Sequence, residues 1–236
     1  MSGHSHFATI KRQKGLKDAV KSNLFSKLSK MISIAIKSGG NANPDTNFKL
    51  RVAIDKAKEN SMPKDNIDRI LKTAAEKADS IEEINYEGFG PYGIGVIVET
   101  ATDNKNRTAQ EMKNIFEKGG GSLGGPNSVL YNFEHKGFLL LEKTKDVERQ
   151  TLTLIDLGVE DIEDKDDGLE VYTKPDQLKE IMKKIKAAGF KVLKMELTLI
   201  PKNLIELTDT PQIEKATHFL ESFEDHDDVQ RVFSNF

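Results

Sequence analysis

The sequence contains no cysteine. This absence excludes disulfide bonds, thiolate metal ligands and a cysteine nucleophile, and it is typical of an intracellular protein, so we expect a cytoplasmic location. No apolar run reaches the roughly 18 residues that a membrane-spanning helix needs, and the N-terminus lacks the apolar core of a signal peptide. We therefore expect no membrane partner.

Catalytic and cofactor-binding patterns are also missing. No Ser-His-Asp arrangement and no pair of carboxylates stands out by its spacing, and no Gly-Lys-Ser/Thr marks a phosphate loop. Residues 119–124 match G-x-G-x-x-G, but they follow an expected helix and precede an expected strand, which is the reverse of a dinucleotide site. We expect a protein that is not an enzyme, with no cofactor, no metal and no small-molecule substrate.

Two acidic segments could suggest a cation site. Residues 160–167 lack the D-x-D-x-D-G order of a calcium loop and its trailing glutamate. Residues 224–228 place His226 among four carboxylates, which could collect divalent ions weakly. A solvated surface turn is the favoured interpretation of both segments.

Charge is distributed unevenly along the chain. Residues 1–77 hold 16 lysines and arginines against 7 aspartates and glutamates, a net charge of +9, whereas the remaining 19 basic and 31 acidic residues give −12. An asymmetry of this kind indicates that the basic part contacts a polyanion. The segment from Gly3 to Lys17 is short, basic and without apolar periodicity, so we expect an arm that an anionic partner orders.

Three amphipathic helices are expected behind this arm. Between residues 17 and 37, apolar residues recur at intervals of three and four, with lysines at the other positions. Similar apolar stripes follow over residues 50–57 and 67–74. Glycines and a proline within residues 38–45 end the first helix, and Pro63 suits the first turn of the third. The prediction is a small helical bundle with basic exposed faces.

From residue 81 onward, strand and helix signals alternate. Residues 86–93 are expected as a turn-rich entry to a strand at 94–100, which is rich in β-branched residues. A polar loop then leads to a helix for which Thr108 and Glu111 have capping-box spacing. Residues 128–133 are expected as the next strand.

A second unit begins near His135. Its expected strands lie at residues 138–141, 159–162, 169–172 and 192–200, and its helices at 147–157 and from Pro175 to Gly189. This β-α-β-β-α-β order is that of a ferredoxin-like unit. The tail adds a helix at residues 211–223 and a strand at 229–233, which would complete the earlier unit.

The expected fold class is therefore α+β, with three domains: an N-terminal helical bundle plus two ferredoxin-like α/β units, one of them discontinuous. The expected domains are residues 1–78, a basic helical domain with the arm; residues 79–135 plus 205–236; and residues 136–204, inserted between them. A linear three-domain arrangement is the alternative.

Several segments together resemble the YebC/PmpR family. They are Gly3-His4-Ser5 with Ile10-Lys11-Arg12, Met62 to Ile67, Tyr86 to Pro91, Asp103 to Thr108, and Gly120 to Gly124. Their order and spacing also match, over essentially the whole chain. One departure is His6-Phe7, where we expect Lys-Trp. The resemblance implies a three-domain α+β protein described as a probable DNA-binding transcriptional regulator, with mitochondrial relatives that activate translation on the ribosome. It implies no enzyme, metal or cofactor.

The leading hypothesis is a nucleic-acid-binding regulator, most directly a DNA-binding transcriptional regulatory protein. The residues expected to contact phosphates are Lys11, Arg12, Lys14, Lys17, Lys21, Lys27 and Lys30, helped by Lys56, Lys58, Lys64 and Arg69. Asn104 and Arg107, at an expected helix start, could also contact a phosphate, although capping explains them as well. The alternatives are a ribosome-associated translation factor that binds ribosomal RNA and a protein-interaction module whose acidic α/β domains face a protein partner.

Overall fold

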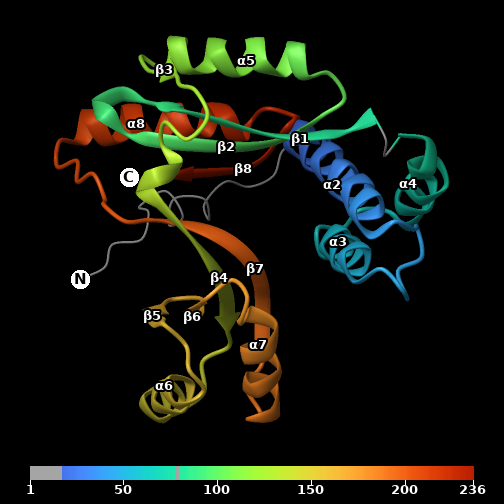
Figure 1. The fold of residues 1–236 in the computed structure, drawn as a ribbon, viewed down its shortest axis with the longest axis vertical. Coiled ribbons are helices and arrows are strands. Elements are labelled where there is room, and N and C mark those ends of the chain that lie inside the picture. Colours follow the sequence, from blue (N-terminus) through green and yellow to red (C-terminus); the bar gives the residue numbers. More distant parts are fainter. Residues whose placement is uncertain (1–17, 78–79) are drawn as a thin grey trace. The chain divides into compact units, whose positions relative to one another are not determined.

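The computed structural model describes residues 18–77 and 80–236. The chain forms two compact units, one made of residues 132–202 and the other of the chain on either side of them. Figure 1 shows helices together with two antiparallel four-stranded sheets, and this combination confirms the α+β class. Among the described helices, none combines the length and the apolar content that a bilayer crossing needs.

The three N-terminal helices are confirmed. They are α2 (Asp18–Gly39), α3 (Phe48–Glu59) and α4 (Lys64–Lys77). The predicted stripes form one hydrophobic core, in which Ile32, Leu50 and Ala57 are fully buried. Helix α2 ends before Gly40, whose φ of 71° is the left-handed conformation that favours glycine.

A buried asparagine holds the turn between α2 and α3. The side-chain oxygen of Asn47 accepts a hydrogen bond from the Leu50 N–H at 3.1 Å, which caps α3. Its amide nitrogen donates to the carbonyls of Ala35 and Asn41 at 2.8 and 2.9 Å. One side chain therefore joins the C-terminal part of α2, the turn and the start of α3.

The first sheet has the order β3-β1-β2-β8 and belongs to the larger unit. Its strands are β1 (Glu82–Phe89), β2 (Gly95–Thr102), β3 (Ser122–Leu123) and β8 (Val229–Ser234). The helices that accompany the sheet along the chain are η2 (Pro91–Gly93), α5 (Lys105–Lys118), η3 (Leu130–Asn132) and α8 (Thr210–Glu224). Strand β8, from the C-terminal tail, pairs with β2. Helices α5 and α8 pack on this sheet through three mutually contacting rings, those of Phe116, Phe219 and Phe223.

Two predictions about the first sheet are wrong. Residues 86–89 continue a strand instead of belonging to a turn, and the turn is confined to residues 90–94. Residues 128–133 contain η3 instead of a strand within this sheet, and the edge strand is β3, inside the glycine-rich segment. The glycines there permit a close approach, since a Cβ on Gly121 would lie 2.2 Å from the Phe89 carbonyl oxygen.

The carboxylate of Glu87 explains why residues 128–133 do not pair as a strand. It is buried, and it accepts backbone N–H bonds from Asn127, Val129 and Leu130, each at 2.8 Å. A side chain thus satisfies the donors that a neighbouring strand would otherwise need. The segment is tied to β1 by one carboxylate.

The second unit, residues 132–202, is ferredoxin-like. Its elements are β4 (Phe133–Leu141), α6 (Val147–Asp156), β5 (Asp161–Lys165), β6 (Gly168–Thr173), α7 (Leu178–Ala187) and β7 (Val192–Pro201). The sheet order β5-β6-β4-β7 is that of the split β-α-β motif. Its core includes Leu139, Leu154 and Ile185. The acidic turn is shorter than predicted and consists of Asp166 and Asp167, because residues 163–165 belong to β5.

Candidate nucleic-acid interface

The predicted phosphate contacts of the arm and the helical domain fall into three groups. Four of them, Lys11, Arg12, Lys14 and Lys17, lie outside the described residues, and so does the side chain of Lys21. The second group lies on α3 and α4, and the third on the polar face of α2. The cations on α3 and α4 are exposed, whereas Lys27 and Lys30 on α2 contact another segment of the chain.

The cations of α3 and α4 face solvent. Lys56, Lys58, Lys64 and Arg69 are all exposed. Lys58 lies 3.6 Å from Asp55 in an exposed ion pair one helical turn away, a contact that is worth little and that a phosphate can replace. Within the described ranges, no hydrogen bond or ion pair of the Lys64 or Arg69 side chain is seen. These four side chains are exposed, and their contact with phosphates stays a prediction.

The cations of α2 instead contact the loop that follows α8. Lys27 donates to the carbonyl of Glu224, and Lys30 donates to the carbonyl of Asp227 at 3.2 Å. Lys30 also forms an ion pair with the carboxylate of Asp228. In this conformation the loop therefore holds the ammonium groups of Lys27 and Lys30, and their contact with phosphates stays a prediction.

Asp228 is the centre of this contact. Its side chain is only 3 % exposed, and its second oxygen accepts from the Thr108 hydroxyl at 2.6 Å and from Arg107 at 3.3 Å. Burial by itself would raise the pKa of Asp228, but hydrogen bonds from Lys30 and Thr108, with the charge of Lys30, lower it to about 2. The carboxylate stays ionised because α2 and α5 both supply donors.

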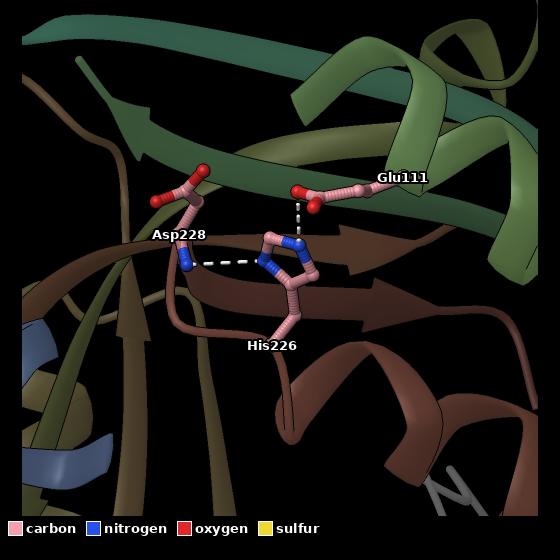
Figure 2. A group of neighbouring side chains, drawn as sticks. All are labelled: Glu111, His226 and Asp228. Atoms are coloured by element: carbon pink, nitrogen blue, oxygen red, sulfur yellow. Dashed lines mark hydrogen bonds and ion pairs between the residues drawn. The ribbon is translucent and has the colours of Figure 1, made fainter. Parts of the chain in front are cut away.

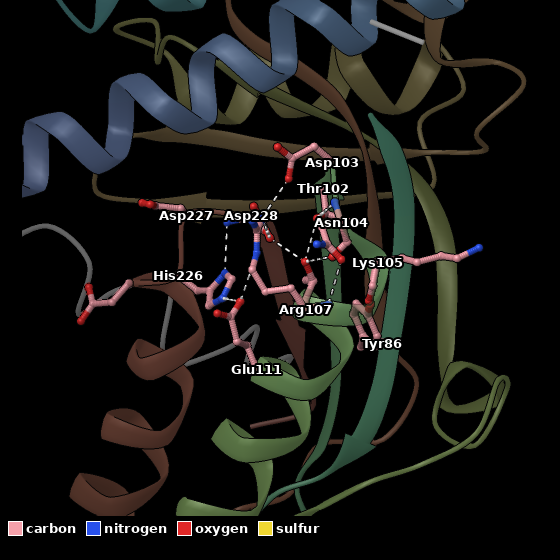
Figure 3. Close-up of polar contacts among 12 residues, drawn as sticks. Tyr86, Thr102, Asp103, Asn104, Lys105, Arg107, Glu111, His226, Asp227 and Asp228 are labelled. Carbon is pink, nitrogen blue, oxygen red and sulfur yellow. Dashed lines mark hydrogen bonds and ion pairs between the residues drawn. The ribbon is translucent and has the colours of Figure 1, made fainter. Parts of the chain in front are cut away.

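The start of α5 contributes to the same cluster, as Figure 3 shows. Asn104 is the N-cap, and its side-chain oxygen accepts from the Arg107 N–H at 3.1 Å. The Arg107 guanidinium bonds to Asp103 at 2.9 Å and to Asp228. Capping therefore accounts for Asn104, and carboxylates hold the Arg107 guanidinium, so a phosphate contact by either residue stays a prediction. Thr108, predicted as a cap, is buried in the first turns of α5.

His226 is held by both of its ring nitrogens, as Figure 2 shows. Its Nδ1 accepts from the Asp228 N–H at 3.1 Å, and Nε2 lies 2.9 Å from the Glu111 carboxylate. Because Nδ1 accepts, Nε2 carries the proton and donates it to Glu111.

Glu111, His226 and Asp228 are close enough together to hold a metal ion. The hydrogen bonds described above already use both ring nitrogens of His226 and both oxygens of Asp228. A metal would have to displace these bonds and compete with the ammonium of Lys30. The chemistry of the cluster is that of a hydrogen-bonded junction, and we assign no metal to it.

Comparisons with known proteins cover the whole chain. Residues 5–77 match the TACO1/YebC protein N-terminal domain, and residues 81–236 match the TACO1/YebC second and third domain. A probable transcriptional regulatory protein of Dictyoglomus turgidum is 45 % identical over 240 residues, covering 100 % of this chain and 96 % of that one. One of Thermotoga maritima is 42 % identical over 240 residues, covering 100 % and 94 %.

A solved structure is also similar. The crystal structure of a conserved hypothetical protein from Aquifex aeolicus has a TM-score of 0.84 to this chain at 36 % sequence identity. The similarity covers 98 % of this chain and 96 % of the Aquifex chain. Fold and sequence therefore agree on one set of relatives, which confirms the resemblance seen in the signature segments.

Proposed function

Because the chain belongs to the TACO1/YebC family, we propose that it is a nucleic-acid-binding regulator of gene expression, with DNA as its partner and transcription as the regulated step. The relatives' name, probable transcriptional regulatory protein, supports the regulatory role. The observation that carries nucleic-acid binding is the net charge of +9 on residues 1–77, beside −12 on the remainder. We propose no catalytic role.

The binding surface is the helical domain together with the arm. The exposed cations of α3 and α4 and the arm residues Lys11, Arg12, Lys14 and Lys17 would contact phosphates, which supply affinity and register without reading the sequence. The rest of the chain, with its net charge of −12, would repel the polyanion. A protein partner on this part of the chain is compatible with this role.

The affinity for duplex DNA is expected to fall steeply with salt. If about six cations meet phosphates, the slope of log affinity against log salt is about −5. Titration of a fluorescent duplex at several salt concentrations measures it. Changing Lys11, Arg12, Lys14 and Lys17 together to glutamine should flatten the slope by about 3 to 4, because each lost contact removes about one.

A matched control carries the same number of changes from a basic residue to glutamine elsewhere in the chain. Lys174, Lys179, Lys183 and Lys186 are exposed residues of the second unit, and their replacement should leave the slope unchanged. A chain without residues 1–20 that bound duplex DNA with the original slope would show that the arm contributes nothing. A chain that bound no nucleic acid under any of these conditions would overturn the proposed function.

A ribosome-associated role in translation is the second candidate. The observation that favours it is that Lys27 and Lys30, on the polar face of α2, contact the protein's own loop in this conformation and not a DNA groove. Binding through phosphates alone also suits structured ribosomal RNA. Sucrose-gradient sedimentation separates the two candidates: co-sedimentation with ribosomes that RNase abolishes indicates translation, and free protein that footprints on promoters indicates transcription.

A further inference from the structure

We propose that residues 224–228, here named the gate loop, close a nucleic-acid-binding face of α2 and leave it when a nucleic acid binds. This inference rests on the proposed function. In the free protein the gate loop holds Lys27 and Lys30; in the bound state the same two side chains would contact phosphates. The loop thus acts as an internal competitor of the partner.

The contact between α2 and the gate loop is continuous. Asn23 donates to the Asp225 carbonyl at 2.6 Å, Lys27 to the Glu224 carbonyl, and Lys30 to the Asp227 carbonyl and the Asp228 carboxylate. Positions 23, 27 and 30 follow the spacing of four and three that lines one face of a helix. One loop therefore contacts three residues along one face of α2, and both cations among them are predicted phosphate contacts.

The gate loop offers these cations what a nucleic-acid backbone would offer. It contains four carboxylates, those of Glu224, Asp225, Asp227 and Asp228, within five residues, and Asp225 and Asp227 are exposed beside the contact. A phosphate that approached Lys27 would meet these like charges at short range, where they repel it. The loop and a polyanion cannot occupy this face of α2 together.

The architecture allows the gate to open without unfolding either side. The buried residues of the helical core all lie between Leu28 and Ile67, and those of the neighbouring sheet core all lie at Ile94 or beyond. The two cores share no residue, and α4 to β1 is the one covalent connection between them. Two of the lysine contacts end on neutral carbonyls, which bind an ammonium less strongly than a charged phosphate oxygen does.

A reversible cross-link tests the gate. Because the chain has no cysteine, the double variant Asn23→Cys with Asp225→Cys carries a single pair of thiols, at positions already joined by a hydrogen bond. The pair is oxidised, or joined by a short bismaleimide where no disulfide forms, and mass spectrometry verifies the link. Cross-linked full-length protein should bind a fluorescent duplex at least tenfold more weakly than the reduced protein, and dithiothreitol should restore binding to the disulfide form.

The single variants Asn23→Cys and Asp225→Cys are the controls, because neither has the second thiol that the intramolecular cross-link needs. Equal affinity of the linked and reduced forms would overturn the gate and leave the proposed function intact. Reduced protein that bound no nucleic acid would overturn the proposed function, and the gate with it. The two failures are therefore distinguishable.

A second variant removes the repulsion and keeps every cation. Asp225→Asn with Asp227→Asn changes two exposed side chains and should raise the affinity several-fold. Asp166→Asn with Asp176→Asn changes the net charge equally at exposed positions of the second unit. If both pairs changed the affinity by the same factor, net charge would explain the effect and the gate would be overturned.

Discussion

Replacing Asp228 with alanine should lower the free energy of unfolding by about 3 to 5 kcal/mol, the range for breaking a buried ion pair by removing one partner. The change would leave Lys30, whose side chain is 18 % exposed, without its carboxylate, and the buried Thr108 hydroxyl without its acceptor. Urea unfolding of the full chain measures the loss. Because Asp228 joins α2 to α5, the helical domain should also unfold separately from the sheet at lower urea.

Two comparisons isolate the buried carboxylate. Asp227→Ala removes an exposed side chain in the same loop and should change the stability by no more than about 0.5 kcal/mol. A double-mutant cycle of Asp228→Ala with Lys30→Met should show strong coupling, because the two residues share one ion pair. Independent, additive effects would mean that the pair does not form in solution.

Acid should remove the part of this stabilisation that depends on the charge of Asp228. The pKa of Asp228 is lowered from 3.8 to about 2, so its ionised form stabilises the folded state above pH 4, and that stability is lost as the pH falls through about 2. The size is on the order of 2 kcal/mol, since one pKa unit corresponds to about 1.4 kcal/mol. Asp228→Asn should flatten the dependence of stability on pH within this window.

The gate loop also shows which structural features can be predicted from the local sequence and which cannot. Its four carboxylates and one histidine predict a solvated turn, and four of its five residues are at least partly exposed to water. Nothing local marks Asp228 as buried, because its partners Lys30 and Arg107 lie 198 and 121 residues away along the chain. Likewise, the periodicity of α2 correctly places Lys27 and Lys30 on its polar face but cannot show what meets that face.

Local patterns predicted where the helices and strands lie better than they predicted which distant segments contact them. The helices of the first 77 residues follow from apolar spacing, and the ferredoxin-like order of residues 132–202 follows from alternating strand and helix signals. The error at residues 128–133 arose because β-branched and aromatic residues there resemble a strand, whereas Glu87, some forty residues earlier, takes up their N–H groups. A long-range side-chain bond overrode a local preference.

Replacing Glu87 with alanine should lower the free energy of unfolding by about 3 kcal/mol or more, because three backbone N–H groups lose a charged acceptor and charge-assisted hydrogen bonds are worth roughly 1.5 to 3 kcal/mol each before the loop relaxes. Urea unfolding measures the loss. Hydrogen exchange should quicken at Asn127, Val129 and Leu130, and much less in the second unit. The exposed Glu83, on the same strand and the same face, is the matched control, and its change to alanine should cost no more than about 0.5 kcal/mol.

The variant Glu87→Gln tests whether the carboxylate's acceptor oxygens or only the shape of the side chain hold this segment. Oε1 accepts one N–H, from Asn127, whereas Oε2 accepts two, from Val129 and Leu130. Glutamine must place an N–H₂ group at one of these two positions, where it would face donors instead of accepting from them. The isosteric change should therefore cost most of what alanine costs. A Gln variant as stable as the original chain would show that the segment from Asn127 to Leu130 is held to β1 by packing and not by the carboxylate.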